Sequence, residues 1–266
     1  MTASLKINLI GSGNLAWNLA ERLRHSQHNV IAVYGRKPEK TKAVAALNRS
    51  QAVTSLINLP HDADLSLVCL ADSAIMEVAP QLHFLKGLIA HSAGSLPLSV
   101  LDQTGERTGV LYPLQTFTFG VKADWDNVWV CLESKQQDDL LLLQEVAQCL
   151  SSQTRIINSE QRQSLHLAAI FTANFNTYLQ SIAENLLLDS NMTFDAMLPL
   201  FKGVYAKIAE IGPREAITGP AARGDMATIN KHLSLLASHP DYQRLYQILT
   251  SMIMDQVTNK KSKQSD

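Results

Sequence analysis

The stretch INLIGSGNLA, residues 7–16, joins an apolar run to a glycine-rich turn and the start of an amphipathic segment. Gly11 permits a tight exit from a strand, Gly13 lets backbone N–H groups close on a pyrophosphate, and the small Ala16 lets a helix pack closely on a sheet. An anion in this turn also meets the positive end of the helix dipole. The stretch therefore predicts a dinucleotide-binding turn whose cofactor-binding residues are Gly11, Ser12, Gly13, Asn14 and Leu15.

The flanking sequence favours this interpretation over a turn that uses glycine for steric reasons alone. Leu15, Leu19 and Leu23 fall on one helical stripe after the turn. The β-rich run Val30–Tyr34 follows at the spacing of a strand–helix–strand unit.

The end of this second predicted strand indicates which dinucleotide binds. Proteins that bind NAD place Asp or Glu there, where the carboxylate accepts a hydrogen bond from the ribose 2′-hydroxyl. This chain instead has Gly35-Arg36-Lys37, with Lys40 close behind. A guanidinium pairs with a 2′-phosphate, which a carboxylate would repel. The predicted cofactor is therefore NADP(H), bound by Arg36, Lys37 and Lys40; the alternative is that these basic residues only solvate a surface loop.

Composition excludes several classes of function. The 266 residues carry a formal net charge of -1, so extensive nucleic-acid binding is not expected. The beginning of the chain lacks a secretory signal pattern, and the three cysteines lack the spacing of metal ligands. Residues 163–183 carry no formal charge, but His166, Asn174, Asn176 and Gln180 argue against a membrane span. We expect a cytoplasmic protein without bound metal.

Predicted strands and helices alternate as far as Ile157, and no convincing strand follows Asn158. Alternation of this kind predicts an α/β fold with a Rossmann-type, doubly wound, mostly parallel sheet. The predicted domains are a Rossmann domain, 1–157, an all-helical domain, 158–258, and a polar tail, 259–266. A long helix is expected from Ser159, with a stripe from Leu165 to Leu186 facing a helical core.

Polar residues directly follow several of the predicted strands. In an open parallel sheet, ligands bind outside the carboxyl ends of the strands. This rule assigns Ala71 and Asp72 to the cofactor, His91 and Ser92 to catalysis, and Gln115 to the substrate. Two alternatives remain open, because Asp72 could cap a helix and His91 could be a hydrogen-bonded structural residue.

The long helix carries a second candidate group, His166 and Asn174. A reductase needs a proton donor near the group that it reduces and an amide that orients the substrate. His166 and Asn174 are the predicted catalytic residues for these roles, although Asn174 falls to one side of His166 in a regular helix. The alternative is that both serve packing or solubility.

A third group lies in the loop Thr218–Asp225. Asp225 suits the cap of the following helix, and Arg223 can hold a substrate carboxylate in a bidentate pair. Thr218, Gly219 and Arg223 are therefore predicted to bind substrate. An Arg223–Asp225 bridge that holds the helix entry is the alternative.

Five motifs, in this order, resemble a bacterial family of Rossmann-like proteins with a helical C-terminal domain of unknown function: Gly11–Ala16, His91–Ser95, Tyr112–Phe117, Leu165–Ala169 and Thr218–Asp225. That family is similar to the group of pyrroline-5-carboxylate reductase, ketopantoate reductase, phosphogluconate dehydrogenase and the deazaflavin-dependent NADP oxidoreductases. The resemblance implies an NADP-binding N-terminal domain and a helical domain that often forms a dimer.

The resemblance also exposes a departure. Ketopantoate reductase and the hydroxyacid dehydrogenases use a Lys and an Asn on the first helix between the domains. In this chain no Lys occupies that stretch, and His166 lies in its neighbourhood instead. The hypothesis is an NADPH-dependent oxidoreductase that reduces a small anionic carbonyl or imine in a cleft between its domains, as a homodimer. The alternative is a non-catalytic NADP-binding module with a helical dimerisation or partner-docking domain.

Overall fold

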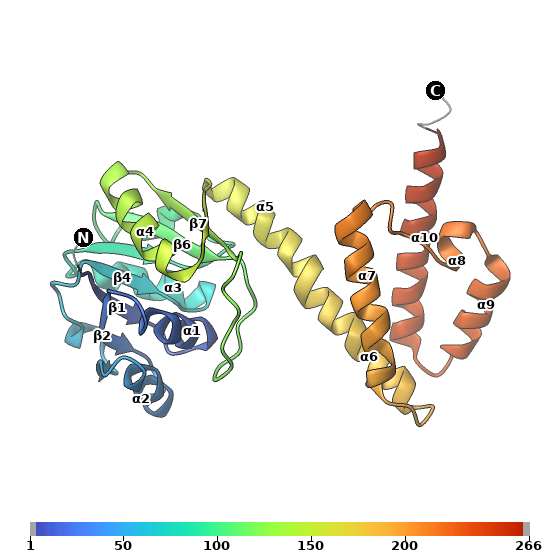
Figure 1. Ribbon diagram of the computed structural model, residues 1–266, viewed down its shortest axis with the longest axis horizontal. Helices are drawn as coiled ribbons and strands as arrows, with labels where there is room; N and C mark the ends of the chain where they lie inside the picture. Colours follow the sequence, from blue (N-terminus) through green and yellow to red (C-terminus); the bar gives the residue numbers. More distant parts are fainter. Residues whose placement is uncertain (1–3, 263–266) are drawn as a thin grey trace. The chain divides into compact units, whose positions relative to one another are not determined.

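The computed structural model describes residues 4–262, and it divides the chain into two compact units that meet between Phe175 and Asn176 (Figure 1). The predicted domain boundary lies earlier, after Ile157. The first turns of the long helix remain with the sheet because Arg162 is fully buried there and forms an ion pair with Glu133 of a strand.

The first unit is built on an eight-stranded sheet with the order β3-β2-β1-β4-β5-β6-β7-β8. Its strands are β1 Lys6–Ile10, β2 Asn29–Tyr34, β3 Gln51–Val53, β4 Leu65–Val68, β5 Leu88–His91, β6 Thr108–Pro113, β7 Trp129–Ser134 and β8 Gln153–Ile156. Neighbouring strands are parallel except for β6 and β7. The predicted doubly wound, mostly parallel sheet is confirmed.

Helices cover both faces of this sheet, because successive strand residues point to opposite sides. Leu9 of β1 packs in one core with three helices, and Ile10 packs in the other core with the segment after β4. The three helices are α1 Asn14–Leu23, α2 Pro38–Ala46 and α4 Gln137–Leu150.

The segment after β4 forms α3 Asp72–Val78, which passes into a 3-10 helix, Ala79–Leu82. Pro80 has no N–H to donate, and its ring clashes with the preceding turn, so the regular helix ends before it. Short 3-10 helices also occupy Leu56–Asn58 and Leu98–Leu101.

A long helical segment follows β8 as α5 Ser159–Ala169 and a π-helix, Ile170–Phe175. The expectation that its apolar stripe faces a helical core is wrong for this part, since Ala168, Thr172 and Phe175 are exposed. On α5 itself only Arg162 is buried, at the end nearest the sheet.

The second unit is entirely helical over its described residues. It consists of α6 Asn176–Leu188, a 3-10 helix Phe194–Met197, α7 Leu198–Ile211, α8 Pro220–Arg223, α9 Met226–Leu235 and α10 Pro240–Ser262. The predicted tail begins at Asn259, but α10 continues through Ser262, and residues 263–266 lie outside the described residues. Across the described chain, every helix is too short or too polar to cross a membrane.

Candidate functional site

The glycine-rich turn has the geometry that a phosphate needs. Gly11 has a φ of 139°, and a Cβ there would lie 2.3 Å from the carbonyl oxygen of Cys69, so only glycine fits. Gly13 differs, because it is the N-cap of α1 and a Cβ on it would meet nothing within 4 Å. The turn therefore leaves open space in front of the unpaired N–H groups of the first turn of α1.

The remaining turn residues have distinct surroundings. The hydroxyl of Ser12 lies against Gly35, where a Cβ would be 2.3 Å from its oxygen. The side chain of Leu15 is half-buried and packs against the core that includes α1, so only the backbone of Leu15 is available to a ligand.

The loop between β6 and β7 is hydrogen-bonded to α1. The side-chain amide of Asn14 donates to the carbonyl of Phe117 at 2.9 Å. The buried amide of Asn18 donates to the carbonyl of Thr118 at 3.1 Å and accepts from the Ala123 N–H at 2.9 Å. The phosphate turn and this loop thus form one connected structure.

The basic residues after β2 are partly free to meet a 2′-phosphate. Arg36 and Lys37 are exposed, and neither takes part in an ion pair within the described residues. Lys37 is also the N-cap of α2. Lys40 contacts the loop instead, with its ammonium 5.1 Å from the centre of the Phe119 ring.

Ala71 and Asp72 stand where α3 begins, beyond the carboxyl end of β4. Ala71 is the N-cap and makes no side-chain cap bond, so the capping role considered for Asp72 is not found. Instead, the Asp72 carboxylate accepts a hydrogen bond from the hydroxyl of Ser95, in the loop after β5. Ala71 and Asp72 are both exposed.

The structure favours a structural role for His91 over proton transfer. Its side chain is fully buried at the end of β5, and Nδ1 accepts from the Ala93 N–H at 3.1 Å. Burial, with a smaller contribution from the Arg162 charge, lowers the pKa of His91 to about 4. Ser92 is also buried, and its hydroxyl donates to the carbonyl of Val68 at 3.1 Å.

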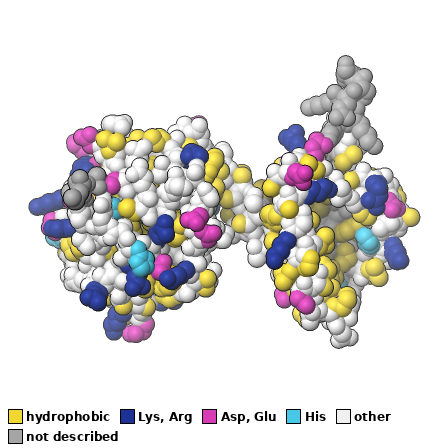
Figure 2. All heavy atoms as spheres, in the orientation of Figure 1, with side chains coloured by type: hydrophobic (Ala, Val, Ile, Leu, Met, Phe, Trp, Pro, Cys, Tyr) yellow, Lys and Arg dark blue, Asp and Glu magenta, His cyan; other side chains and the backbone are white. Residues whose placement is uncertain are grey.

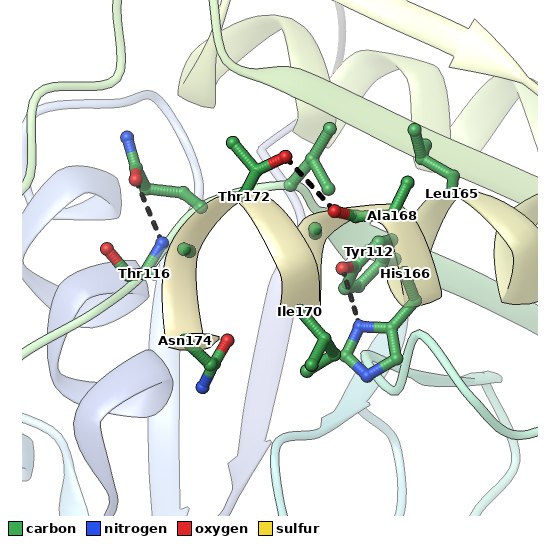
Figure 3. A pocket seen from close by; sticks show the side chains of 12 residues that line it. Tyr112, Thr116, Leu165, His166, Ala168, Ile170, Thr172 and Asn174 are labelled. Carbon is green, nitrogen blue, oxygen red and sulfur yellow. Dashed lines mark hydrogen bonds between the residues drawn. The ribbon is translucent and has the colours of Figure 1, made fainter. Parts of the chain in front are cut away.

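A pocket of about 390 Å³ lies between the end of β6 and the long helix (Figure 3). Its wall on the β6 side includes the predicted substrate residue Gln115, which is exposed. Its other wall includes both predicted catalytic residues of the helix, His166 and Asn174. The complete lining is Tyr112, Leu114, Gln115, Thr116, Leu165, His166, Ala168, Ala169, Ile170, Thr172, Ala173 and Asn174.

The π-helix accounts for the meeting of His166 and Asn174. Eight residues of regular helix would turn Asn174 about 80° away from His166. In a π-helix each turn holds more residues, so each residue advances less around the axis. The segment Ile170–Phe175 is wound in this way, and Figure 3 shows His166, Ile170 and Asn174 on one side. π-Helical turns occur often at functional sites.

Sequence reasoning missed Tyr112 as a site residue. Its hydroxyl lies 3.0 Å from Nδ1 of His166 in the pocket wall. Tyr112 begins the motif Tyr112–Phe117, of which sequence analysis assigned only Gln115 to the site, and its partner is 54 residues further along the chain. The residue before Pro113 in a buried strand gave no signal of such a pair.

A second missed feature is the buried attachment of α5 to the sheet. Arg162 pairs with Glu133 of β7 and donates to the carbonyl of Leu96. The same carboxylate accepts from the hydroxyl of Ser159 at 3.0 Å. This cluster holds one end of the helix that carries His166, which limits how far the ring can move.

The third predicted group belongs to the second unit, whereas the pocket lining belongs to the first. Thr218 and Arg223 are exposed, and Gly219 has a φ of 104° before α8. The predicted cap is confirmed, since the Asp225 carboxylate accepts from the Thr228 N–H at 3.1 Å. Hydrogen bonds from Thr228 hold the pKa of Asp225 below its usual value. No ion pair within the described part of the chain joins Arg223 to Asp225.

Comparison with known proteins identifies both parts of the chain. Residues 6–93 match a family described as NADP oxidoreductase, coenzyme F420-dependent, and residues 128–253 match a domain of unknown function, DUF2520. A Bacteroides fragilis protein, provisionally described as an NADP oxidoreductase, is 37% identical with a TM-score of 0.91 over 95% of this chain and 98% of that one. The chain belongs to this NADP oxidoreductase family. Membership confirms the resemblance and agrees with the predicted cofactor, NADP(H).

More distant structures share the fold of the family. A Thermotoga maritima protein, TM1727, is 20% identical with a TM-score of 0.68, covering 96% of this chain and 99% of that one. An imine reductase from Myxococcus stipitatus, in complex with NADP+, is 16% identical with a TM-score of 0.64, covering 96% and 94%. A pyrroline-5-carboxylate reductase from Coxiella burnetii is 17% identical with a TM-score of 0.56, covering 97% and 98%. No curated protein matches the chain.

Proposed function

We propose that this family member is an NADPH-dependent reductase that reduces a small carbonyl or imine compound at the pocket of His166 and Asn174. The observation that carries the proposal is the π-helix, which turns a titratable imidazole and an amide toward the same pocket. A reductase needs both a proton donor and a group that orients the reacting bond.

The cofactor has a fitting site in the first unit. The open space at Gly13 and the N–H groups of α1 suit the pyrophosphate, and exposed Arg36 and Lys37 suit the 2′-phosphate. Asp72 and Ala71 border the same edge of the sheet, beyond β4. When bound, the cofactor supplies a hydride.

The pocket residues act on the acceptor. His166 gives a proton to the oxygen or nitrogen of the reduced bond, and the Asn174 amide orients that atom before reaction. Apolar side chains such as Leu114, Leu165 and Ile170 surround these groups and lower the local water content.

The residues that line the pocket include no Asp, Glu, Lys or Arg, which suits a neutral reacting group. Imine reductases are among the proteins that share the fold, and a pyrroline-5-carboxylate reductase is another. We therefore propose cyclic imines as the first class to test. An anionic group on the substrate, with Arg223 as its partner, stays a prediction.

The test is oxidation of NADPH, followed by its absorbance, against a panel of cyclic imines and keto acids. With an accepted substrate, His166→Gln should lower kcat by roughly 100-fold, because general acid catalysis contributes about that much or more. Exposed His25→Gln is the matched control and should leave kcat unchanged. If NADPH binds and no member of a broad panel is reduced, the non-catalytic module becomes the better interpretation.

We also propose that a second copy of the chain covers the helical unit. Among its described residues only Ile229 and Leu236 are buried apolar side chains. Figure 2 shows hydrophobic side chains over the visible face of this unit. Exposed examples are Leu188, Met192, Leu198, Leu200, Val204, Ile211, Met226, Leu235, Ile248 and Met252. A core this small buries too little apolar surface to stabilise a unit of this size on its own.

A further inference from the structure

The imidazole of His166 is held by contacts on two sides. Tyr112 lies 3.0 Å from Nδ1, and its ring meets the imidazole edge-on, with centres 5.9 Å apart at an angle of 80°. Gly94 lies against the ring, since a Cβ there would be 2.6 Å from Cγ and Nδ1. These contacts come from β6 and from the loop after β5, so two separate parts of the sheet edge fix one ring.

The bond to Tyr112 also distinguishes the two nitrogens of His166. Figure 3 shows Nδ1 directed at the Tyr112 hydroxyl and the other ring nitrogen, Nε2, directed away from it. A neutral imidazole carries its proton on one nitrogen only, and the partner of one nitrogen decides the state of the other. Burial raises the pKa of Tyr112 to about 12, so the phenol keeps its proton at any ordinary assay pH.

We infer that Tyr112 is a positioning residue, which fixes the orientation and tautomer of His166 so that Nε2 is the atom that exchanges protons with the substrate. This inference rests on the proposed reductase function. Sequence analysis did not identify Tyr112, and His166 had no assigned partner there.

The proton balance is simple in this arrangement. When bound, the cofactor would supply a hydride to the acceptor carbon, and the π electrons of the C=O or C=N bond would move to the oxygen or nitrogen. That atom takes the Nε2 proton of the imidazolium form of His166. The neutral ring keeps its proton on Nδ1, which donates a hydrogen bond to the Tyr112 oxygen, and water later returns a proton to Nε2.

The test compares wild type with Tyr112→Phe, which keeps the aromatic ring and removes the hydroxyl. Protein labelled with 15N in histidine reports the tautomer of each neutral imidazole by NMR, and His166→Gln identifies the signals of residue 166. We expect one tautomer of His166 in wild type and a mixture in Tyr112→Phe. Equal tautomer populations in the two proteins would overturn the inference.

A matched pair elsewhere supplies the control. Tyr246 lies 2.8 Å from Nδ1 of His232 in the second unit, with the two rings edge-on at 84°. Tyr246→Phe should change the signals of His232 and leave those of His166 unchanged.

Kinetics give an independent readout on any accepted substrate. Tyr112→Phe should lower kcat by roughly 10- to 100-fold, with KM and NADPH affinity unchanged, because a misoriented acid fails only during proton transfer. A turnover number unchanged in Tyr112→Phe contradicts the inference. Absence of turnover in wild type would instead reject the reductase proposal, while the NMR comparison still decides the role of Tyr112.

Discussion

Arg36 is the residue on which cofactor choice depends most directly. It is exposed after β2 and has no ion-pair partner within the described residues, as a 2′-phosphate ligand requires. Arg36→Ala should weaken NADPH binding by roughly 10- to 100-fold, the value of one charge-assisted contact, and leave NADH binding nearly unchanged. Fluorescence titration with both nucleotides measures this difference.

Arg24→Ala is the control for that experiment. Arg24 is also exposed, but it caps the opposite end of α1 from the phosphate turn. Equal losses of NADPH and NADH affinity in Arg36→Ala would refute the assignment to the 2′-phosphate.

His91 should make the first unit less stable in acid. Its pKa is about 4 when folded and 6.5 when unfolded, so the unfolded chain binds more protons between these values. The part of the free energy of unfolding that depends on a neutral His91 is therefore fully present above about pH 6.5 and is lost as the pH falls toward 4. The loss attributable to His91 should be about 2 kcal/mol between pH 7.5 and 5.

The measurement is urea unfolding at both pH values, followed by tryptophan fluorescence. All three tryptophans, at 17, 125 and 129, lie in the first unit. His91→Asn keeps an acceptor for the Ala93 N–H but cannot titrate, so it should remove that part of the pH dependence. The same pH dependence in both proteins would contradict the pKa assignment.

Single residues of the site were only partly accessible to sequence reasoning. Strand ends and a helix edge selected Gln115, His166 and Asn174, and the structure places all three in the lining of one pocket. The buried partners could not be inferred, because Tyr112 pairs with His166 and Arg162 with Glu133 only through the folded chain. The burial of His91 was not predictable either, because a histidine at the end of a strand can be buried or exposed.

At the scale of elements, we expect two glycines of the turn between β1 and α1 to have different roles: Gly11 is needed for folding stability, and Gly13 is needed for cofactor binding. Gly11→Ala forces a methyl group within 2.3 Å of the Cys69 carbonyl at a φ of 139°, and should cost about 3 kcal/mol or more. Gly13→Ala should fold with a loss of no more than about 1 kcal/mol, because its Cβ meets open space. Its methyl group would occupy the space predicted for the pyrophosphate, so NADPH affinity should fall at least tenfold.

Thermal unfolding and NADPH titration of the two variants check this separation. Each variant serves as the control for the other, since the substitution is the same and the sites are two residues apart. Normal NADPH affinity in a folded Gly13→Ala protein would remove the turn from the cofactor site.

Most elements were predictable because burial and periodicity decide them. The β-rich run Val30–Tyr34 forms β2, Asn29–Tyr34, within one residue of the predicted bounds. The π-helix was not predictable, since the sequence of Ile170–Phe175 has the same apolar spacing as an ordinary helix. The antiparallel pairing of β6 with β7 also depends on the loop between them.

At the scale of the whole molecule, the uncovered helical unit predicts self-association. Light scattering should give about twice the chain mass of 29.3 kDa. Leu200→Lys combined with Met252→Lys, both 63% exposed before substitution, should weaken the dimer by roughly 100-fold, because an interface would bury the new charges.

Leu141→Lys provides the comparison for that double variant. Leu141 is also exposed, at 53%, but lies on α4 of the first unit. A wild-type monomer at micromolar concentration, or a double variant as dimeric as Leu141→Lys, would reject the proposed partner.

The loop that α1 holds through Asn14 and Phe117 has a kinetic consequence. Two residues before Phe117, Gln115 enters the pocket wall, so a nucleotide settling at the turn also steadies the surface that receives the second reactant. We expect ordered addition, in which coenzyme precedes acceptor. Thermodynamic reciprocity then requires that a bound acceptor analogue raise the affinity for coenzyme by the same factor by which coenzyme raises the affinity for the analogue.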